Sequence, residues 1–281
     1  MNLTLSGKMD EALRDAIVAI ASAQESVALH ETALRLLRVA DTPQVRALVA
    51  TRCDAARVDH AFIDDDAKLS DYRVLAMDMD STLITIECID ELADLVGKKA
   101  EVAAITEAAM RGEIADFAES LRRRVALLGG APTSLLERVY AERLALSPGA
   151  KALLAAARNA GLTTLLVSGG FTFFTERLKA RLGFEQASAN TLEIVDDKLT
   201  GRVLGKIVDA AGKARALGEL LTSMRSLKSS AIVIGDGAND LAMMQGAGLS
   251  VAYHAKPVVR AATSHAIDFG GLDVLLDWFA D

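Results

Sequence analysis

Downstream of residue 72, three short apolar runs each end at a polar or glycine-rich sequence. The runs, with the residues that follow them, are Val74–Met77 before Asp78, Leu162–Val167 before Ser168-Gly169-Gly170, and Ala231–Ile234 before Gly235-Asp236-Gly237. Such runs are typical of buried parallel strands, whose carboxyl ends carry functional groups. Helical patterns separate them, so the sequence predicts an α/β fold with a doubly wound, Rossmann-like parallel sheet.

Two further stretches interrupt this alternation. Residues 87–147, between the first and second runs, keep a helical pattern and contain no convincing strand. We therefore expect a helical insert there, acting as a cap over the sheet. Residues 192–201 instead alternate apolar and polar positions around an Asp-rich turn, which predicts a hairpin.

The first 70 residues have a different character. After a short apolar start at Leu3–Leu5, helical periodicity passes through Ala12, Ile17 and Ile20 and returns at Leu34–Leu37. A second helical stretch follows a break at Pro43, and the polar, acidic segment 64–71 is typical of a linker. We expect a small, helix-heavy accessory domain over residues 1–71 and a second domain over residues 72–281.

Composition and charge narrow the function classes. The chain has 31 Lys and Arg against 38 Asp and Glu, a net charge of -7, so its overall field favours neither nucleic acid nor an anionic membrane. The N-terminus has no secretory pattern and no apolar run exceeds six residues, so we expect a cytoplasmic protein. Cys53 and Cys88 lack metal-ligand spacing and are expected to be buried thiols. An anionic substrate would need a local binding device.

Candidate chemistry gathers at the predicted strand ends. Asp78 and Asp80 leave one strand, and Asp236 and Asp240 follow another. Taken singly, each could cap a turn or a helix. If the strands are neighbours, four carboxylates converge, and two like charges 4 Å apart repel by roughly 4 kcal/mol at an effective dielectric near 20. Such a cluster requires a cation, and a ligand set of oxygen atoms alone favours Mg²⁺ over zinc.

Parts that could bind an anion accompany these carboxylates. Ser168 and Gly169 provide a hydroxyl and unhindered N–H groups at a strand-to-helix turn, and Lys213 could bring a positive charge to the same edge. An ionised Asp needs no base to attack phosphorus, unlike Ser or Thr. Carboxylate, Mg²⁺ and Lys together make a workable apparatus for phosphoryl transfer.

These residues resemble the haloacid dehalogenase superfamily of phosphatases. The four superfamily motifs occur in order, as Asp78-Met79-Asp80-Ser81-Thr82, Ser168-Gly169-Gly170, Lys213 and Gly235-Asp236-Gly237-Ala238-Asn239-Asp240. Within this superfamily, the sequence resembles more closely the phosphoserine phosphatase family, in the stretches 87–92, 109–113, 117–125, 168–171 and 252–257. The resemblance covers residues 72 to about 275 and does not include the first 70 residues. Some members of the family carry an amino-acid-sensing domain in front of the catalytic domain, so the resemblance implies a reduced form of that domain as the candidate for residues 1–71.

The resemblance implies roles for the motif aspartates. Asp78 would be the nucleophile that becomes an aspartyl phosphate. Asp80 would be the general acid for the leaving oxygen and then the base for the hydrolytic water, with its backbone carbonyl on Mg²⁺. The implied metal ligands are therefore Asp78, Asp80 and Asp236. Asp240 would not bind the metal directly but would hold these ligands in position.

It also implies how a substrate would be held. Ser168, Gly169, Lys213 and Asn239 would bind the phosphate. In the insert, Glu87 would pair with the substrate ammonium and Arg124 with its carboxylate. Arg122 and Arg123 are adjacent to Arg124, and one of the three must be solvated. Met110 and Phe117 are expected to pack the insert rather than touch substrate.

The activity that the resemblance implies is Mg²⁺-dependent hydrolysis of O-phospho-L-serine to L-serine and phosphate, the last step of serine biosynthesis. The same nucleophile would permit transfer of the phosphoryl group to another alcohol such as homoserine. A module that stores phosphate on Asp78, as receiver domains do, is a third possibility that needs neither Asp80 nor a cap. The expected partner is the small-molecule substrate, with no nucleic acid or membrane, and a homodimer is possible.

Overall fold

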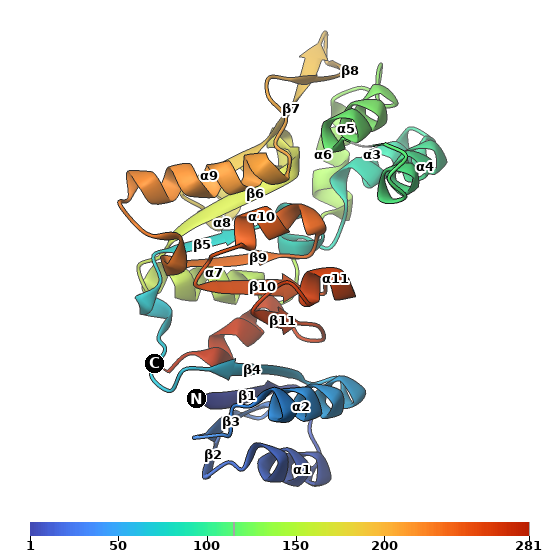
Figure 1. Ribbon diagram of the computed structural model, residues 1–281. Coiled ribbons are helices and arrows are strands. Elements are labelled where there is room, and N and C mark those ends of the chain that lie inside the picture. Colours follow the sequence, from blue (N-terminus) through green and yellow to red (C-terminus); the bar gives the residue numbers. More distant parts are fainter. Residues whose placement is uncertain (115, 281) are drawn as a thin grey trace.

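The structure, a computed structural model, describes residues 1–114 and 116–280, the side chain of Met110 excepted. Its strands are β1 (Asn2–Ser6), β2 (Glu25–His30), β3 (Ala33–Leu37), β4 (Asp59–Ile63), β5 (Val74–Met77), β6 (Thr163–Phe171), β7 (Gln186–Val195), β8 (Lys198–Leu204), β9 (Ala231–Gly235), β10 (Leu249–Tyr253) and β11 (His265–Ile267). Its α-helices are α1 (Glu11–Ala21), α2 (Pro43–Ala56), α3 (Cys88–Leu95), α4 (Lys99–Met110), α5 (Phe117–Ala126), α6 (Ser134–Arg138), α7 (Ala150–Asn159), α8 (Thr172–Leu182), α9 (Ala210–Ser223), α10 (Leu241–Met244) and α11 (Pro257–Arg260). The strands form two separate sheets (Figure 1).

The larger sheet has the order β11-β10-β9-β5-β6-β7-β8, and its neighbours are parallel except for β7 and β8. Alternate residues of β5 face opposite sides, as a strand's pleat requires. Val74 and Ala76 pack in one core with α9 and α10, whereas Leu75 and Met77 pack in another with α7 and α8. Helices cover both faces, so the predicted doubly wound α/β fold is confirmed.

The three apolar runs of the sequence are the central strands β5, β6 and β9, with β5 paired to both of the others. Their carboxyl ends therefore meet at one edge of the sheet. β6 continues to Phe171, beyond the predicted end at Val167, because the chain rejoins β7 there after a shift in register. β10 and β11 extend the sheet and were not predicted.

Residues 87–147 contain α3 to α6, in agreement with the predicted helical insert. The chain enters and leaves the insert through two adjacent segments, where Ile84 bridges Leu146 and the Thr85 N–H donates to the Ala145 carbonyl at 3.0 Å. The predicted hairpin is confirmed as β7 and β8, which are antiparallel. Its turn lies against the insert, where the Thr133 N–H donates to the Asp197 carbonyl at 2.9 Å.

The smaller sheet is antiparallel with the order β2-β3-β1-β4, and its elements follow a βαββαβ sequence. α1 and α2 fulfil the two helical expectations around Ile17 and after Pro43. The expected helix through Leu34–Leu37 is wrong, because these residues form β3. Leu36 pairs with Leu3 of β1 and is fully buried between the strands and helices. Three leucines in four residues fit a helix face and a strand equally well, and pairing with β1 decides between them.

The smaller sheet docks on the C-terminal part of the chain. Asp59 of β4 accepts from the N–H groups of Asp268 and Gly270, both at 2.6 Å. Arg35 of β3 donates to the carbonyls of Asp277 at 2.7 Å and Phe279 at 2.6 Å. Figure 1 places this unit beside β11, away from the insert. Across the described residues, no helix has the length and apolar character that crossing a membrane demands.

Candidate active site

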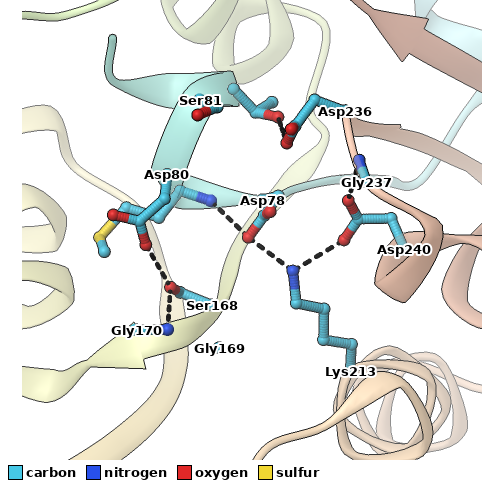
Figure 2. Close-up of polar contacts among 12 residues, drawn as sticks. Asp78, Asp80, Ser81, Ser168, Gly169, Gly170, Lys213, Asp236, Gly237 and Asp240 are labelled. Atoms are coloured by element: carbon cyan, nitrogen blue, oxygen red, sulfur yellow. Dashed lines mark hydrogen bonds and ion pairs between the residues drawn. The ribbon is translucent and has the colours of Figure 1, made fainter. Parts of the chain in front are cut away.

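Three carboxylates meet at the carboxyl edge of the central strands. Asp78 directly follows β5, Asp236 directly follows β9, and Asp240 lies in the turn before α10. One oxygen from each of the three lies within 4.8 Å of the others. Figure 2 shows them around the end of β5, as the convergence of parallel strand ends predicts.

Lys213 of α9 lies between two of these carboxylates (Figure 2). Its Nζ is 2.7 Å from Oδ1 of Asp78 and 2.8 Å from Oδ1 of Asp240, and the side chain is 1% exposed. Burial alone would lower the pKa of Lys213, but the two carboxylates raise it above its usual value. Lys213 is therefore a fixed positive charge beside Asp78.

One ammonium does not balance three carboxylates. Burial, and then the charge of Asp240, raise the pKa of Asp236 to about 6 and hold that of Asp78 above its usual range, although Lys213 opposes both effects. A divalent cation would offset this excess of negative charge, and the donors are all oxygen atoms, the ligands that Mg²⁺ prefers. The residues present therefore fit Mg²⁺.

The carboxylate of Asp80 does not belong to this acidic cluster. Its Oδ1 accepts from the Cys88 N–H at 2.8 Å, and its Oδ2 accepts from the Ser168 hydroxyl at 3.1 Å. Burial raises the pKa of Asp80, while these hydrogen bonds oppose the shift. Of the residues expected to bind metal, the structure thus brings together the carboxylates of Asp78 and Asp236, with that of Asp240 beside them. Only a main-chain contact from Asp80, as expected above, remains compatible with this arrangement.

Asp240 has both carboxylate oxygens engaged by the protein. Oδ1 is held by Lys213, and Oδ2 accepts from the Gly237 N–H at 3.1 Å. The residue is fully buried. This position behind the other carboxylates fits the orienting role that the sequence suggested.

The glycine loop after Val167 approaches Asp80 closely. The Gly170 N–H donates to the Ser168 hydroxyl at 2.7 Å. A Cβ at Gly170 would lie 2.7 Å from Oδ2 of Asp80, so glycine is required there for this close approach. The main chain at Gly170 therefore lies directly beside the Asp80 carboxylate.

A cavity of about 80 Å³ joins this loop to the insert. Its lining residues are Asp80, Glu87, Ile89, Phe117, Leu121, Arg124, Gly169, Gly170, Phe171 and Asn239. Five of them are among the predicted site residues. Ser168 and Lys213 do not line the cavity: Ser168 contacts Asp80, and Lys213 contacts Asp78. A larger cavity, of about 340 Å³ between β4 and β11, contains none of the predicted site residues.

Arg124 differs from the two adjacent arginines in its surroundings. Arg122 and Arg123 are exposed, and Arg123 pairs with Glu119 at 2.7 Å on the surface. Arg124 alone of the three lines the cavity, where burial lowers its pKa and the carboxylates of Asp90 and Glu87 oppose that effect. Within the described part of the chain, Arg124 makes no ion pair within 4 Å, and its Nε donates to the Ser120 carbonyl at 3.4 Å.

Glu87 lies at the mouth of the same cavity with much of its surface open to solvent. Its Oε1 accepts from the Ser81 hydroxyl at 2.7 Å. Desolvation by the surrounding protein, with the nearby charge of Asp80, raises the pKa of Glu87 to about 8. The cavity thus has the carboxyl group of Glu87 and the guanidinium of Arg124, and no ion pair joins the two among the described residues.

Some contacts were not foreseen from the sequence. The Thr82 hydroxyl donates to Oδ1 of Asp236 at 3.0 Å, and Ser81 and the Cys88 N–H hold Glu87 and Asp80 as described. Ser81 and Thr82 lie inside the first motif, so position in the motif was the available signal. Phe117 packs against the core, as expected, and also lines the cavity. The expectation for the Met110 side chain lies outside the described residues.

A family model described as haloacid dehalogenase-like hydrolase matches residues 75–245. The chain belongs to this family. A relative named phosphoserine phosphatase, from a Polaromonas species, is 56% identical over 216 residues, which are 75% of this chain and 92% of the relative. The haloacid dehalogenase-like fold, expected from four short motifs, is thereby confirmed.

Solved structures agree with this assignment. A probable phosphoserine phosphatase from Vibrio cholerae has a TM-score of 0.83 at 38% identity, covering 99% of this chain and 85% of the other. A substrate-bound phosphoserine phosphatase complex has a TM-score of 0.69 at 33% identity, covering 74% of this chain and 99% of the other. The first likeness includes the N-terminal unit, because it spans nearly the whole chain.

Proposed function

We propose that this member of the haloacid dehalogenase-like hydrolases is a phosphoserine phosphatase, which hydrolyses O-phospho-L-serine to L-serine and phosphate. The observation that carries the proposal is the 80 Å³ cavity, which joins Asp80 and the Gly169 loop to the carboxyl group of Glu87 and the guanidinium of Arg124, neither of which has an ion-pair partner among the described residues. Phosphoserine has an ammonium and a carboxylate beyond its phosphate, and these charges complement the two groups. Relatives named phosphoserine phosphatase support the same substrate.

In the first step, a carboxylate oxygen of Asp78 attacks phosphorus and the bond from phosphorus to the seryl oxygen breaks. Asp80 delivers a proton to that leaving oxygen, a role suited to a buried carboxyl whose pKa is raised. In the second step, Asp80 takes a proton from water, which attacks the aspartyl phosphate and releases phosphate and Asp78.

Fixed donors hold the transferring group. Lys213, buried against Asp78, supplies positive charge, and Ser168, Gly169 and Asn239 supply hydrogen-bond donors around the phosphate. Asp78 and Asp236, with the Asp80 carbonyl, would bind Mg²⁺, and Asp240 orients this group. When bound, Mg²⁺ would offset charge on the phosphate oxygens.

We assign the remaining parts of the chain by what they contribute. The insert, residues 87–147, supplies Glu87 and Arg124 and is joined to the core through the adjacent segments at Ile84 and Leu146, so we propose that it serves as the cap. Residues 1–71 supply none of the site residues, and we propose an accessory role for them.

Turnover of phosphoserine tests the function directly. The wild-type protein should release phosphate with Mg²⁺, whereas Asp78→Asn should release almost none, because an amide of the same shape cannot attack phosphorus. Retention of more than about a hundredth of the wild-type rate, a loss under roughly 2.7 kcal/mol, would show that Asp78 is not the nucleophile. Adding homoserine separates hydrolysis from transfer, since a transferase would accumulate phosphohomoserine.

A further inference from the structure

The pairing between β6 and β7 changes register at residues 168–170, the glycine loop. β6 and β7 pair Val167 with Ser188 and next pair Phe171 with Asn190, so four steps along β6 match two along β7. Residues 168–170 therefore bulge out of the ladder. A bulge leaves backbone groups without their strand partners, and these groups need other hydrogen bonds.

Asn190 supplies one of those hydrogen bonds from its side chain. Its Nδ2 donates to the Gly169 carbonyl at 2.8 Å, inside the bulge. Its Oδ1 accepts from the Val208 N–H, also at 2.8 Å. The residue is 1% exposed, so water does not readily replace either bond.

Val208 begins the segment that leads to Lys213. The next residue, Asp209, caps α9 by accepting from the Gly212 N–H at 2.7 Å. The carbonyl of Asp209 also accepts from the Lys213 N–H at 2.8 Å. The position of Val208 thus sets where the first turn of α9, and with it Lys213, lies beside Asp78.

We propose that Asn190 is a positioning residue for the phosphoryl group, which ties the Gly169 loop to the helix that carries Lys213. The inference rests on the proposed function, because it assigns these two elements to the same phosphate. Asn190 lines no part of the cavity and makes its two bonds to main-chain atoms, so it acts through the groups that it holds. Neither bond was foreseeable from the motifs.

Two substitutions remove different parts of this link. Asn190→Asp keeps an oxygen for the Val208 N–H but presents an oxygen to the Gly169 carbonyl, which separates the two elements by repulsion. Asn190→Ala removes both bonds without adding charge, and it tests the inference if the first variant does not fold. Because a misplacement of about 1 Å can cost about 100-fold in rate, we expect kcat/KM to fall about 10- to 100-fold.

The decisive readouts follow the phosphate rather than the serine. The loss in kcat/KM should be equal for phosphoserine and p-nitrophenyl phosphate. Inorganic phosphate, titrated calorimetrically into the Mg²⁺-loaded protein, should bind about tenfold more weakly to the variants. This titration needs no turnover, so it still tests the inference if the wild-type protein fails to hydrolyse phosphoserine, an outcome that would contradict only the proposed function.

Asn2 offers a matched control. Its side-chain amide also joins two main-chain groups, the Asp65 carbonyl and the Arg38 N–H, in the N-terminal unit. Asn2→Asp should lower the melting temperature without changing kcat/KM or phosphate binding. The inference is overturned if folded Asn190 variants bind phosphate like the wild type, or if their losses are confined to phosphoserine.

Discussion

Replacement of Arg124 tests whether the cavity recognises the charges of serine. In the described structure Arg124 is partly buried and has no carboxylate within ion-pair distance. A cation in this state gains little in the free protein, so Arg124→Ala should change the free energy of unfolding by less than about 1 kcal/mol. The same arginine should matter only when a substrate carboxylate faces it.

The expected loss follows from that contact. A hydrogen bond to a charged group contributes about 1.5–3 kcal/mol, and a bidentate pair in a closed site about 2–4 kcal/mol. Arg124→Ala should therefore lower kcat/KM for phosphoserine about 30- to 1000-fold. Glu87→Gln should lie at the lower end of this range, because Glu87 is open to solvent. Arg124→Lys should rescue only part, since an ammonium cannot form a bidentate pair.

The assay compares two substrates and two arginines. p-Nitrophenyl phosphate has neither ammonium nor carboxylate, so its hydrolysis by Arg124→Ala and Glu87→Gln should change far less. Arg123→Ala is the matched control, because Arg123 is the adjacent, exposed arginine and pairs with Glu119. Equal losses on both substrates would refute the assignment, and so would a loss in Arg123→Ala as large as that in Arg124→Ala.

Two predictions concern the acidic cluster. Mg²⁺ at a hundred times its dissociation constant should raise the melting temperature by roughly 5–10 °C, and Asp236→Ala should remove most of this response; a melting curve indifferent to Mg²⁺ in the wild type would contradict the metal site. Thr82→Val removes the hydroxyl that holds Asp236 but keeps the side chain's shape. The Mg²⁺ concentration for half-maximal activity should therefore rise about tenfold in this variant. Thr85→Val is the control, because Thr85 is exposed, and it should leave that concentration unchanged.

The positions of the catalytic groups along the fold were predictable because strand ends converge. An apolar run that stops at Asp78 and another that stops before Asp236 define two neighbouring strands, and the sheet then brings their carboxylates together. The direction of a side chain after such a stop is not encoded in the run. Asp80 follows Asp78 by two residues but faces Ser168, because the chain has already left β5 at Met77 and the alternation of a strand no longer sets the direction of its side chains.

Long-range pairing explains what the sequence could not supply. The leucines of β3 match either a helix or a strand until β1 is placed beside them. Arg124 could be separated from Arg123 only once the insert was packed over the cavity. The contacts of Asn190 join residues 169 and 208, and no local pattern indicates them.

The stability of the contact between the N-terminal unit and the larger sheet should depend on pH through His60. His60 of β4 lines the cavity between β4 and β11. Burial lowers the pKa of His60 from 6.5 to about 4, and Arg260, His265 and Arg46 act in the same direction, while Asp54 opposes them. Below pH 6.5 the His60 imidazole therefore binds a proton in the unfolded chain, whereas in the folded protein it stays neutral until about pH 4. Stability from this group is complete above pH 6.5 and is lost as the pH falls.

The lost stability is about 2 kcal/mol by pH 5 and approaches about 3 kcal/mol near pH 4, since one pKa unit corresponds to about 1.4 kcal/mol. His60→Gln has no proton to gain, so its unfolding free energy should fall less steeply between pH 7 and pH 5. Urea denaturation of both proteins at matched pH values measures the difference, in which the carboxylates common to both cancel. If the two stability curves run parallel between pH 7 and pH 5, His60 is not held neutral at the docked interface, and the packing of β4 against β11 does not resist its protonation.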